Sequence, residues 1–297
     1  MTLTLPALMN GLTYGALLFL VASGFTLIFG LLRVVNMSHG AFYLLGAYVG
    51  YTVAAWLGGW LAVLGPDVAR AVSWPLAVLG AAAAVGSLAF LLEMLLKQVP
   101  GETPQTLLTL ALAIMAGDVC MWIWGGLPLT LRPPTFLRQP VLLFGMPYPG
   151  FRLFVLAVAI LVGVGLYVLL FRTQLGRIIR AGVDNRRMVS ALGINIDRLF
   201  TSVFVLGGAL TGLSGAIGGS YLAFQPGTDF DILTLALFVV VIGGMGSLAG
   251  SAIGALIVGL VDSFGRTYLS ELSVFLLGGT VMVILAFRPR GLFGRPS

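Results

Sequence analysis

Long uninterrupted runs of apolar residues restrict this chain more than any other feature. A helix needs ~20 apolar residues to cross the ~30 Å hydrocarbon core of a membrane. The sequence has eight runs of about that length: Leu5–Leu32, Ala41–Leu64, Val72–Leu92, Thr106–Leu127, Phe151–Phe171, Arg198–Leu222, Ile232–Leu260 and Leu272–Phe287. They do not alternate with period two, as the strands of a membrane barrel would. We therefore predict an all-α polytopic membrane protein that forms one transmembrane domain over residues 1–297.

The charge content agrees with that prediction. Only 9% of the 297 residues are charged, against about 25% in a soluble protein. The net charge of +6 does not indicate a nucleic-acid partner, because the basic residues lie between the apolar runs. That placement is typical of loops that fix the orientation of a membrane protein, so the expected surroundings are a lipid bilayer.

The arginines predict which loops are cytoplasmic. The connection 172–198 holds six of them, opposed only by Asp184 and Asp197: Arg172, Arg177, Arg180, Arg186, Arg187 and Arg198. The tail adds Arg288, Arg290 and Arg295 without an acid. Basic loops stay in the cytoplasm, so we expect the loop and the C-terminus inside. The N-terminus and the short loop with Asp229 and Asp231 then lie outside. Arg132 and Arg138, in a Pro-rich stretch on the outer side, run against this assignment.

The number of crossings predicts a break in the seventh run. If Ile232–Leu260 crossed the membrane once, the basic tail would end up outside. A straight helix of that length would also measure ~43 Å, which exceeds the membrane core. Both problems disappear if the run breaks at Gly243, Gly244 and Gly246, before Ser247, and returns to the side from which it entered. Backbone freed by a break must be buried in protein or line a watery cavity.

A similar interruption, Arg33–Gly40, separates the first two runs. One Gly-interrupted segment in each half is typical of a transport site between two inverted repeats. We therefore place the translocation pathway at these two breaks, with Asn36, Ser38, His39, Gly40, Gly243, Gly244, Gly246 and Ser247 as its candidate residues. The simpler alternatives are that Asn36 and Ser38 cap the next helix, and that His39 is a helix-start residue bonded to nearby backbone.

Asp118 is the acid that lies clearly within an apolar run. A carboxylate inside a membrane is costly and suggests a functional site. It either meets a cationic group or a proton, or it is hydrogen-bonded to a neighbouring helix.

The sequence does not predict ATP hydrolysis, another catalytic activity or a metal site on this chain. A P-loop needs a Gly-Lys-Ser/Thr ending to hold phosphates and Mg²⁺, and the single lysine, Lys97, is followed by Gln98. His39 and Cys120 are the only histidine and cysteine, so no metal site or catalytic triad is indicated. We predict a protein that is not an enzyme and holds no cofactor or metal. Its energy would come from a partner or from an ion gradient.

Six segments in order resemble the branched-chain amino acid permease family of ABC importers, the leucine/isoleucine/valine type. They are Asn10–Leu17, Ala22–Gly30, Asn36–Phe42, Thr173–Ile194 with Asn195, Gly243–Ser247 with Gly250 and Gly254, and Arg288–Gly294. Met37 and Ser38 replace the phenylalanine and alanine of the family's Asn-Phe-Ala-His-Gly signature. Residues from about 56 to 150 contribute little to the likeness.

The resemblance implies an assembly in the bacterial inner membrane. This chain would pair with a second homologous permease, two cytoplasmic ATPases that use ATP and Mg²⁺, and a periplasmic substrate-binding protein. Substrates in similar systems are branched-chain and other amino acids, urea and short amides. The alternative is a secondary transporter or channel that works alone. Proton or ion coupling would favour several acids within the apolar runs, and only Asp118 lies clearly in one.

The resemblance also implies that the cytoplasmic loop supplies a helix that couples to an ATPase. We assign it to Asp184–Ile194, with an apolar face of Met188, Ala191 and Leu192. Asp184, followed by Asn185, would stand near the helix start, where the dipole favours an acid. Gly193, before Ile194, would end the helix. The simpler alternative is a solvated loop helix with no partner.

Overall fold

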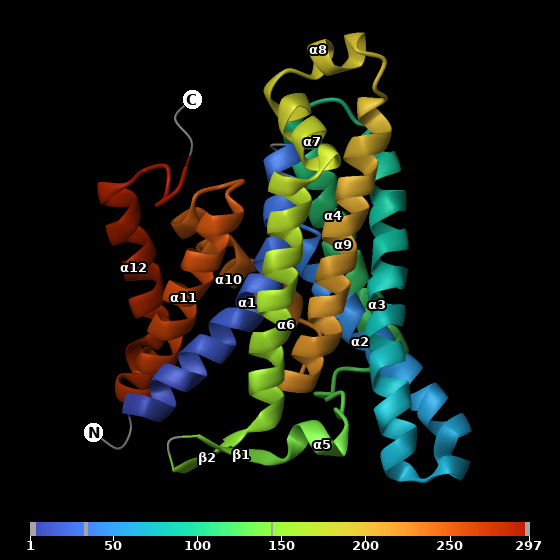
Figure 1. The fold of residues 1–297 in the computed structure, drawn as a ribbon, viewed down its shortest axis with the longest axis vertical. Coiled ribbons are helices and arrows are strands. Elements are labelled where there is room, and N and C mark those ends of the chain that lie inside the picture. The colour runs from blue at the N-terminus through green and yellow to red at the C-terminus, as the bar shows by residue number, and fades with distance from the viewer. Residues whose placement is uncertain (1–3, 33–34, 144, 295–297) are drawn as a thin grey trace.

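The computed structural model describes residues 4–32, 35–143 and 145–294. Arg33, Val34 and Arg295, which entered the predictions above, lie outside these ranges. The regular secondary structure of the described part is helical apart from an isolated bridge between Leu129 and Phe224 and one small hairpin of β1 (Pro140–Leu143) and β2 (Met146–Pro149), with Pro140 opposite Pro149. The all-α prediction is confirmed (Figure 1).

Nine longer helices carry the fold: α1 (Thr4–Leu32), α2 (His39–Trp60), α3 (Pro66–Leu96), α4 (Glu102–Trp124), α6 (Gly150–Tyr167), α9 (Ile196–Tyr221), α10 (Thr228–Gly243), α11 (Leu248–Tyr268) and α12 (Ser273–Phe287). Short helices at Leu61–Leu64, Val168–Arg172 and Ser270–Leu272 join or extend them, together with α5 (Thr135–Arg138), α7 (Gln174–Asp184) and α8 (Arg186–Ala191). Seven helices in the described residues are long and apolar enough to cross a membrane. The predicted Ile232–Leu260 run is two helices, as the crossing count required.

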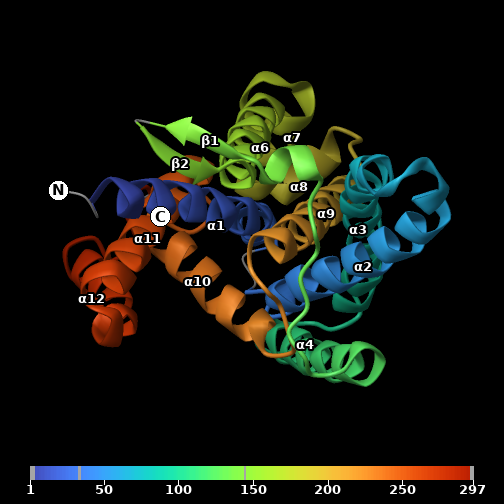
Figure 2. The ribbon, with the colours of Figure 1, turned by 90° about the horizontal axis from the view of Figure 1, so that it is seen from below.

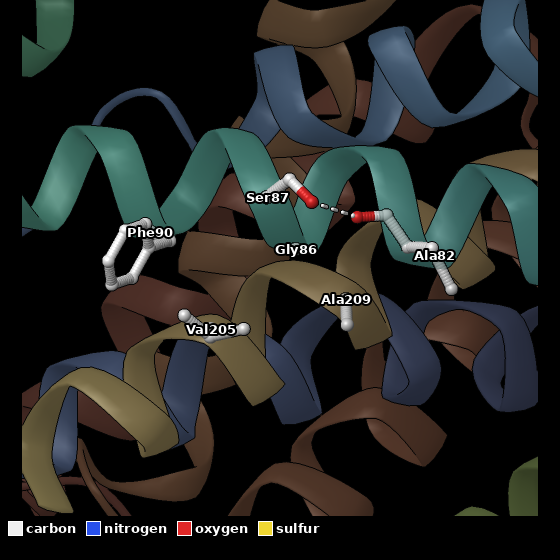
Figure 3. A pocket seen from close by; sticks show the side chains of 7 residues that line it. Ala82, Gly86, Ser87, Phe90, Val205 and Ala209 are labelled. Carbon is white, nitrogen blue, oxygen red and sulfur yellow. Dashed lines mark hydrogen bonds between the residues drawn. The ribbon is translucent and has the colours of Figure 1, made fainter. Parts of the chain in front are cut away.

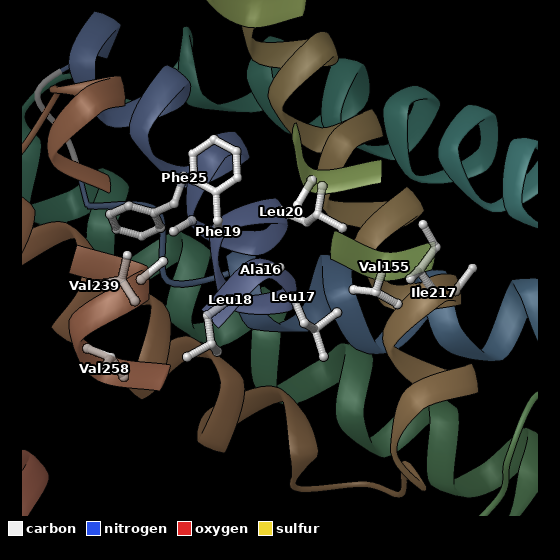
Figure 4. Close-up of a cluster of buried hydrophobic side chains, with 14 of the residues drawn as sticks. Ala16, Leu17, Leu18, Phe19, Leu20, Phe25, Val155, Ile217, Val239 and Val258 are labelled. Atoms are coloured by element: carbon white, nitrogen blue, oxygen red, sulfur yellow. The ribbon is translucent and has the colours of Figure 1, made fainter. Parts of the chain in front are cut away.

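Helix α1 is the centre of the bundle. Leu17, Leu18 and Leu20 on its different sides are all buried. Residues of four other helices surround them, including Val155 of α6, Ile217 of α9, Val239 of α10 and Val258 of α11 (Figure 4). A helix that is apolar all round is stable only when it is buried all round, which explains why this helix became the core.

Two long helix pairs approach through small residues. On α1, Gly11 and Gly15 face Gly259 and Ala255 of α11, so closely that an added Cβ would meet backbone atoms. The second pair repeats this arrangement, with Gly208 and Gly212 of α9 against Ala89 and Val85 of α3. Small residues let backbones approach in membranes, where the hydrophobic effect does not drive helices together. Both pairs are antiparallel, as the order of their contacts shows.

The helices α1–α4 and α9–α12 form an inverted repeat. Helices α1 and α9 run in opposite directions, because Tyr14 stacks on Tyr221 with ring centroids 6.4 Å apart while Gly24 packs on Gly207 further along. In each half a long helix is followed by a non-helical segment, a second helix, and a third helix that runs back along the second. The third helix of each half packs on the first helix of the other.

This symmetry corrects the pairing of the two predicted breaks. The counterpart of the segment before α2 is the connection 222–227 before α10, not Gly243–Gly246. The glycine turn at 244–247 joins α10 to α11 and corresponds to the connection 61–65 between α2 and α3. The prediction paired the two segments by their glycines. The true counterpart of the segment before α2 contains a single glycine, Gly227, in a left-handed conformation at φ 100°.

Gly250→Leu should destabilise the protein far more than Leu256→Ala on the same helix, α11. An added Cβ at Gly250 would overlap the carbonyl oxygen of Gly243, whereas Leu256 is 38% exposed. We expect Gly250→Leu to cost about 3 kcal/mol or more through overpacking, and Leu256→Ala about 1 kcal/mol. Thermal unfolding of both variants in the same detergent checks this. Equal unfolding temperatures and equal yields would contradict it.

Candidate translocation site

Helix α2 begins inside the bundle. His39, its first residue, is fully buried. Its ring Nε2 lies 2.9 Å from the carbonyl oxygen of Val21 and 3.3 Å from the Thr211 hydroxyl. Val21 and Thr211 lie well inside α1 and α9, so α2 starts at mid-height of these helices. His39 is a helix-start residue bonded to backbone, as the simpler prediction held, but that backbone belongs to another helix.

The start of α10 meets the start of α2 at this depth. An added Cβ at Gly40 would overlap the carbonyl oxygen of Asp229. Asp229, which we predicted in an outer loop, instead lies buried in the first turn of α10 and accepts the Gly227 N–H at 3.0 Å. A helix N-terminus carries positive partial charge that stabilises an acid there, and no charge-counting rule detects that. From this contact α2 and α10 run to opposite ends of the molecule.

The segment before α2 is tied to α4 through Thr109. The Met37 N–H donates to the Thr109 hydroxyl at 3.1 Å, and the Ser38 hydroxyl donates to the Thr109 carbonyl at 2.6 Å. Asn36 accepts the Ser38 N–H at 3.0 Å in a local turn. Neither side chain caps α2, so the capping prediction was wrong. Sequence reasoning also missed Thr109, which lies in an apolar helix without any motif.

Two buried polar atoms, one in this segment and one further along α2, have no hydrogen-bond partner among the described residues. They are the Asn36 side-chain nitrogen and the Tyr48 hydroxyl. Buried polar groups are nearly always hydrogen-bonded. Tyr48 stacks on Trp124 of α4 and packs edge-on against Phe224, with ring centroids 4.7 and 5.0 Å away. The Asn36 nitrogen and the Tyr48 hydroxyl therefore keep unused hydrogen-bonding capacity.

The second predicted break is a tight turn. Helix α10 ends at Gly243, and Gly244 and Gly246 adopt φ values of 98° and 82° that favour glycine. The Ser247 hydroxyl accepts the Gly250 N–H at 3.1 Å and so caps α11. The chain reverses here, which confirms the predicted break in this run.

The segment after α12 completes this turn. The N–H groups of Leu292 and Phe293 donate to the carbonyls of Ile242 and Gly243 at 2.8 and 2.9 Å. The last carbonyls of a helix lack partners within it, so this segment caps α10. The motif Arg288–Gly294, which carries part of the family resemblance, thus has a structural role.

Asp118 does not lie at either break. It is exposed on the outer side of α4. Its neighbour Gly117 faces the body of the protein, where the position of an added Cβ would be 3.8 Å from the Asp229 carboxylate.

The loop 172–198 forms α7 and α8 at one end of the molecule, opposite the β1–β2 hairpin (Figure 1). Asp184 ends α7 and does not start the next helix, which corrects our assignment. Asn185 is the cap of α8 instead, because its side chain accepts the Met188 N–H at 3.0 Å. Gly193 follows at φ 80°, where we expected the helix to end.

The predicted apolar stripe of α8 is exposed. Met188 and Leu192 are 66% and 73% exposed, and Ala191 beside them is also exposed. Val189, which we had not singled out, is buried in a cluster with Ile179 and Phe200 and anchors the loop. The loop is therefore held by one side while it presents apolar side chains on the other.

The described surface also has grooves, which lie away from the starts of α2 and α10. One of about 360 Å³ runs along the outside of α3 and α9, between Gly86, Phe90 and Val205 (Figure 3). Its Ser87 hydroxyl is already bonded to the Ala83 carbonyl of its own helix. This groove offers a solute no free polar group.

Thr109→Val should destabilise the protein more than Thr106→Val. The first change removes the acceptor of the Met37 N–H, whereas the Thr106 hydroxyl bonds only to its own helix at Glu102. An unsatisfied buried donor costs about 1–3 kcal/mol. Thermal unfolding of the two variants in one detergent measures the difference. A Thr106→Val loss as large as that of Thr109→Val would show that the tie to α4 is unimportant.

Comparison with known proteins agrees with this architecture. A family model described as the permease component of branched-chain amino acid transport systems matches residues 7–285. The permease protein BraD of the high-affinity branched-chain amino acid transport system of Pseudomonas aeruginosa is 29% identical over 99% of this chain and 96% of its own length. LivH of Escherichia coli, with the same description, is 27% identical over the same shares. LivM of Escherichia coli is 30% identical over 50% of this chain and 36% of its own length. The chain belongs to the branched-chain amino acid transport permease family.

Proposed function

We propose that this chain is the translocation-pathway subunit of an ABC importer for branched-chain or related amino acids. As a member of this family it is a multi-pass transport permease of the bacterial inner membrane and not an enzyme. The observation that supports the finer proposal is the contact between the starts of α2 and α10 inside the bundle. Helices that begin near the bilayer midplane are how many transporters build solute sites.

The chemistry at this contact suits an amino acid. Helix starts favour anionic groups such as a carboxylate, and Asp229 supplies the opposite charge for an ammonium group. Asn36 in the segment before α2 and Tyr48 further along α2 carry buried polar atoms that have no partner among the described residues. The close fit of Gly40 against Asp229 means that a solute passes only if α2 and α10 separate. Short amides and urea would use the same hydrogen-bonding groups.

Energy would reach the pathway through the loop 172–198. A helix as short as α8 is marginal in water without a partner, and an amphipathic helix laid in an apolar groove is a common recognition mode. Met188 and Leu192 would be the anchors on a cytoplasmic ATPase, which binds the ATP and Mg²⁺. The other proposed partners are a second permease, a second ATPase and a periplasmic binding protein.

Leu192→Asp should uncouple ATP hydrolysis from uptake without unfolding the membrane part. It places a charge in the proposed apolar contact, whereas Ser190→Asp places the same charge on another exposed side of α8 and should be tolerated. We expect at least a tenfold loss of uptake for Leu192→Asp in the reconstituted importer, with ATPase association and ATP turnover scored separately. Full uptake with normal association would exclude α8 as the coupling element.

A separate experiment tests which end of the protein faces the periplasm and which faces the cytoplasm. With Cys120→Ala as background, Ser270→Cys should react with an impermeant thiol reagent only from the periplasmic side. Ser190→Cys in α8 should react only from the cytoplasmic side. Both serines are exposed, at opposite ends of the molecule. The reverse pattern would overturn the orientation while leaving the fold intact.

A further inference from the structure

The outer face of α4 is unlike a lipid surface. Three residues of this helix are buried against the body: Thr109, Ala113 and Cys120. The outer face exposes large apolar side chains, with Asp118 among them: Leu107, Ile114, Met115, Val119 and Trp122. The carboxylate is thus on the outside of a helix long and apolar enough to cross the membrane.

Asp118 also lies near the depth at which α2 and α10 begin. The adjacent Gly117 approaches Asp229, and Asp229 meets Gly40 at the depth where α2 begins. A carboxylate at bilayer depth is costly, and such groups face protein or water. It follows that this face of α4 is covered by something other than lipid.

The outer faces of α6 and α3 differ from it in the described residues. The middle of α6 exposes Ile160, Leu161 and Val164, and α3 exposes Leu79 and Leu88 beside the groove of Figure 3. These surfaces suit lipid chains. On the side of α4, however, α10 adds the exposed Asp231 and Thr234. Figure 2 shows α4 and α10 together on one side of the molecule, with α6 on the opposite side.

We infer that the α4 face around Asp118 is the surface on which a second, non-identical permease of this family packs. This rests on the proposed function, which requires two permeases. A two-fold contact of identical copies centred on Asp118 would bring two carboxylates together, which is unfavourable. A different chain can instead supply a hydrogen-bond donor or a cation. Escherichia coli holds two different relatives of this chain, LivH and LivM.

Photocrosslinking tests the surface directly. We would place p-benzoylphenylalanine at Met115 on α4 and, as the control, at Leu161 on α6, which are 59% and 71% exposed. In membranes that hold the complete importer, the Met115 probe should form an adduct with the second permease, and the Leu161 probe should not. No protein adduct at Met115, an adduct between two copies of this chain, or an equal permease adduct at Leu161 would each overturn the inference.

Substitution of Asp118 gives an independent measurement. We expect Asp118→Leu to reduce co-purification of the second permease at least tenfold, while Asp118→Asn, which keeps a hydrogen-bonding oxygen, retains most of it. The unfolding temperature of the isolated subunit should stay the same for both. On a lipid face, Asp118→Leu would be harmless, and that result would contradict the inference. Wild-type protein that purifies without any second permease would overturn the proposed function itself.

Discussion

The close contact of Gly40 with the backbone of Asp229 is the constraint on which the rest of the architecture depends. It joins the starts of two helices deep inside the protein, where exposed peptide groups cannot be left without partners. His39 holds the carbonyl of Val21, Thr109 holds the segment before α2, and Asp229 accepts the Gly227 N–H. The bonds of Thr109 and Asp229 support backbone that is not helical at that depth, and the bond of His39 ties the start of α2 to α1.

The long helices provide the frame for this contact. The helices of the pairs α1–α11 and α3–α9 pack closely through small residues. These pairs fix the positions between which α2 and α10 lie. The residues after α12 fasten the end of α10 to the glycine turn. The frame is therefore closely packed, and α2 and α10 begin inside it, which is an arrangement suited to opening and closing a path.

Much of this fold was predictable, because apolar length and arginine placement act segment by segment. The membrane helices, the reversal near Gly243 and the left-handed Gly193 just after α8 all followed from local rules. The pairing of the two breaks did not, since the inverted repeat becomes visible only through contacts such as that of Gly40 with Asp229. Thr109 was missed for the same reason, because its partners are distant in sequence. Val189 was missed because its burial depends on how the loop 172–198 folds. Asp184 was misplaced because Asn185, next to it, makes the stronger cap.

The central claim is that solute passes the starts of α2 and α10. Thr228, at the start of α10, tests it when replaced by cysteine in a Cys120→Ala background and probed with an impermeant thiol reagent. The assembled importer should show labelling at Thr228→Cys in one nucleotide state and protection in the other, because the path opens to one side at a time. Leu127→Cys beyond the end of α4, where the leucine is 78% exposed, should label in both states. If Thr228→Cys stays unlabelled in every state while Leu127→Cys reacts, the pathway does not run through these helix starts.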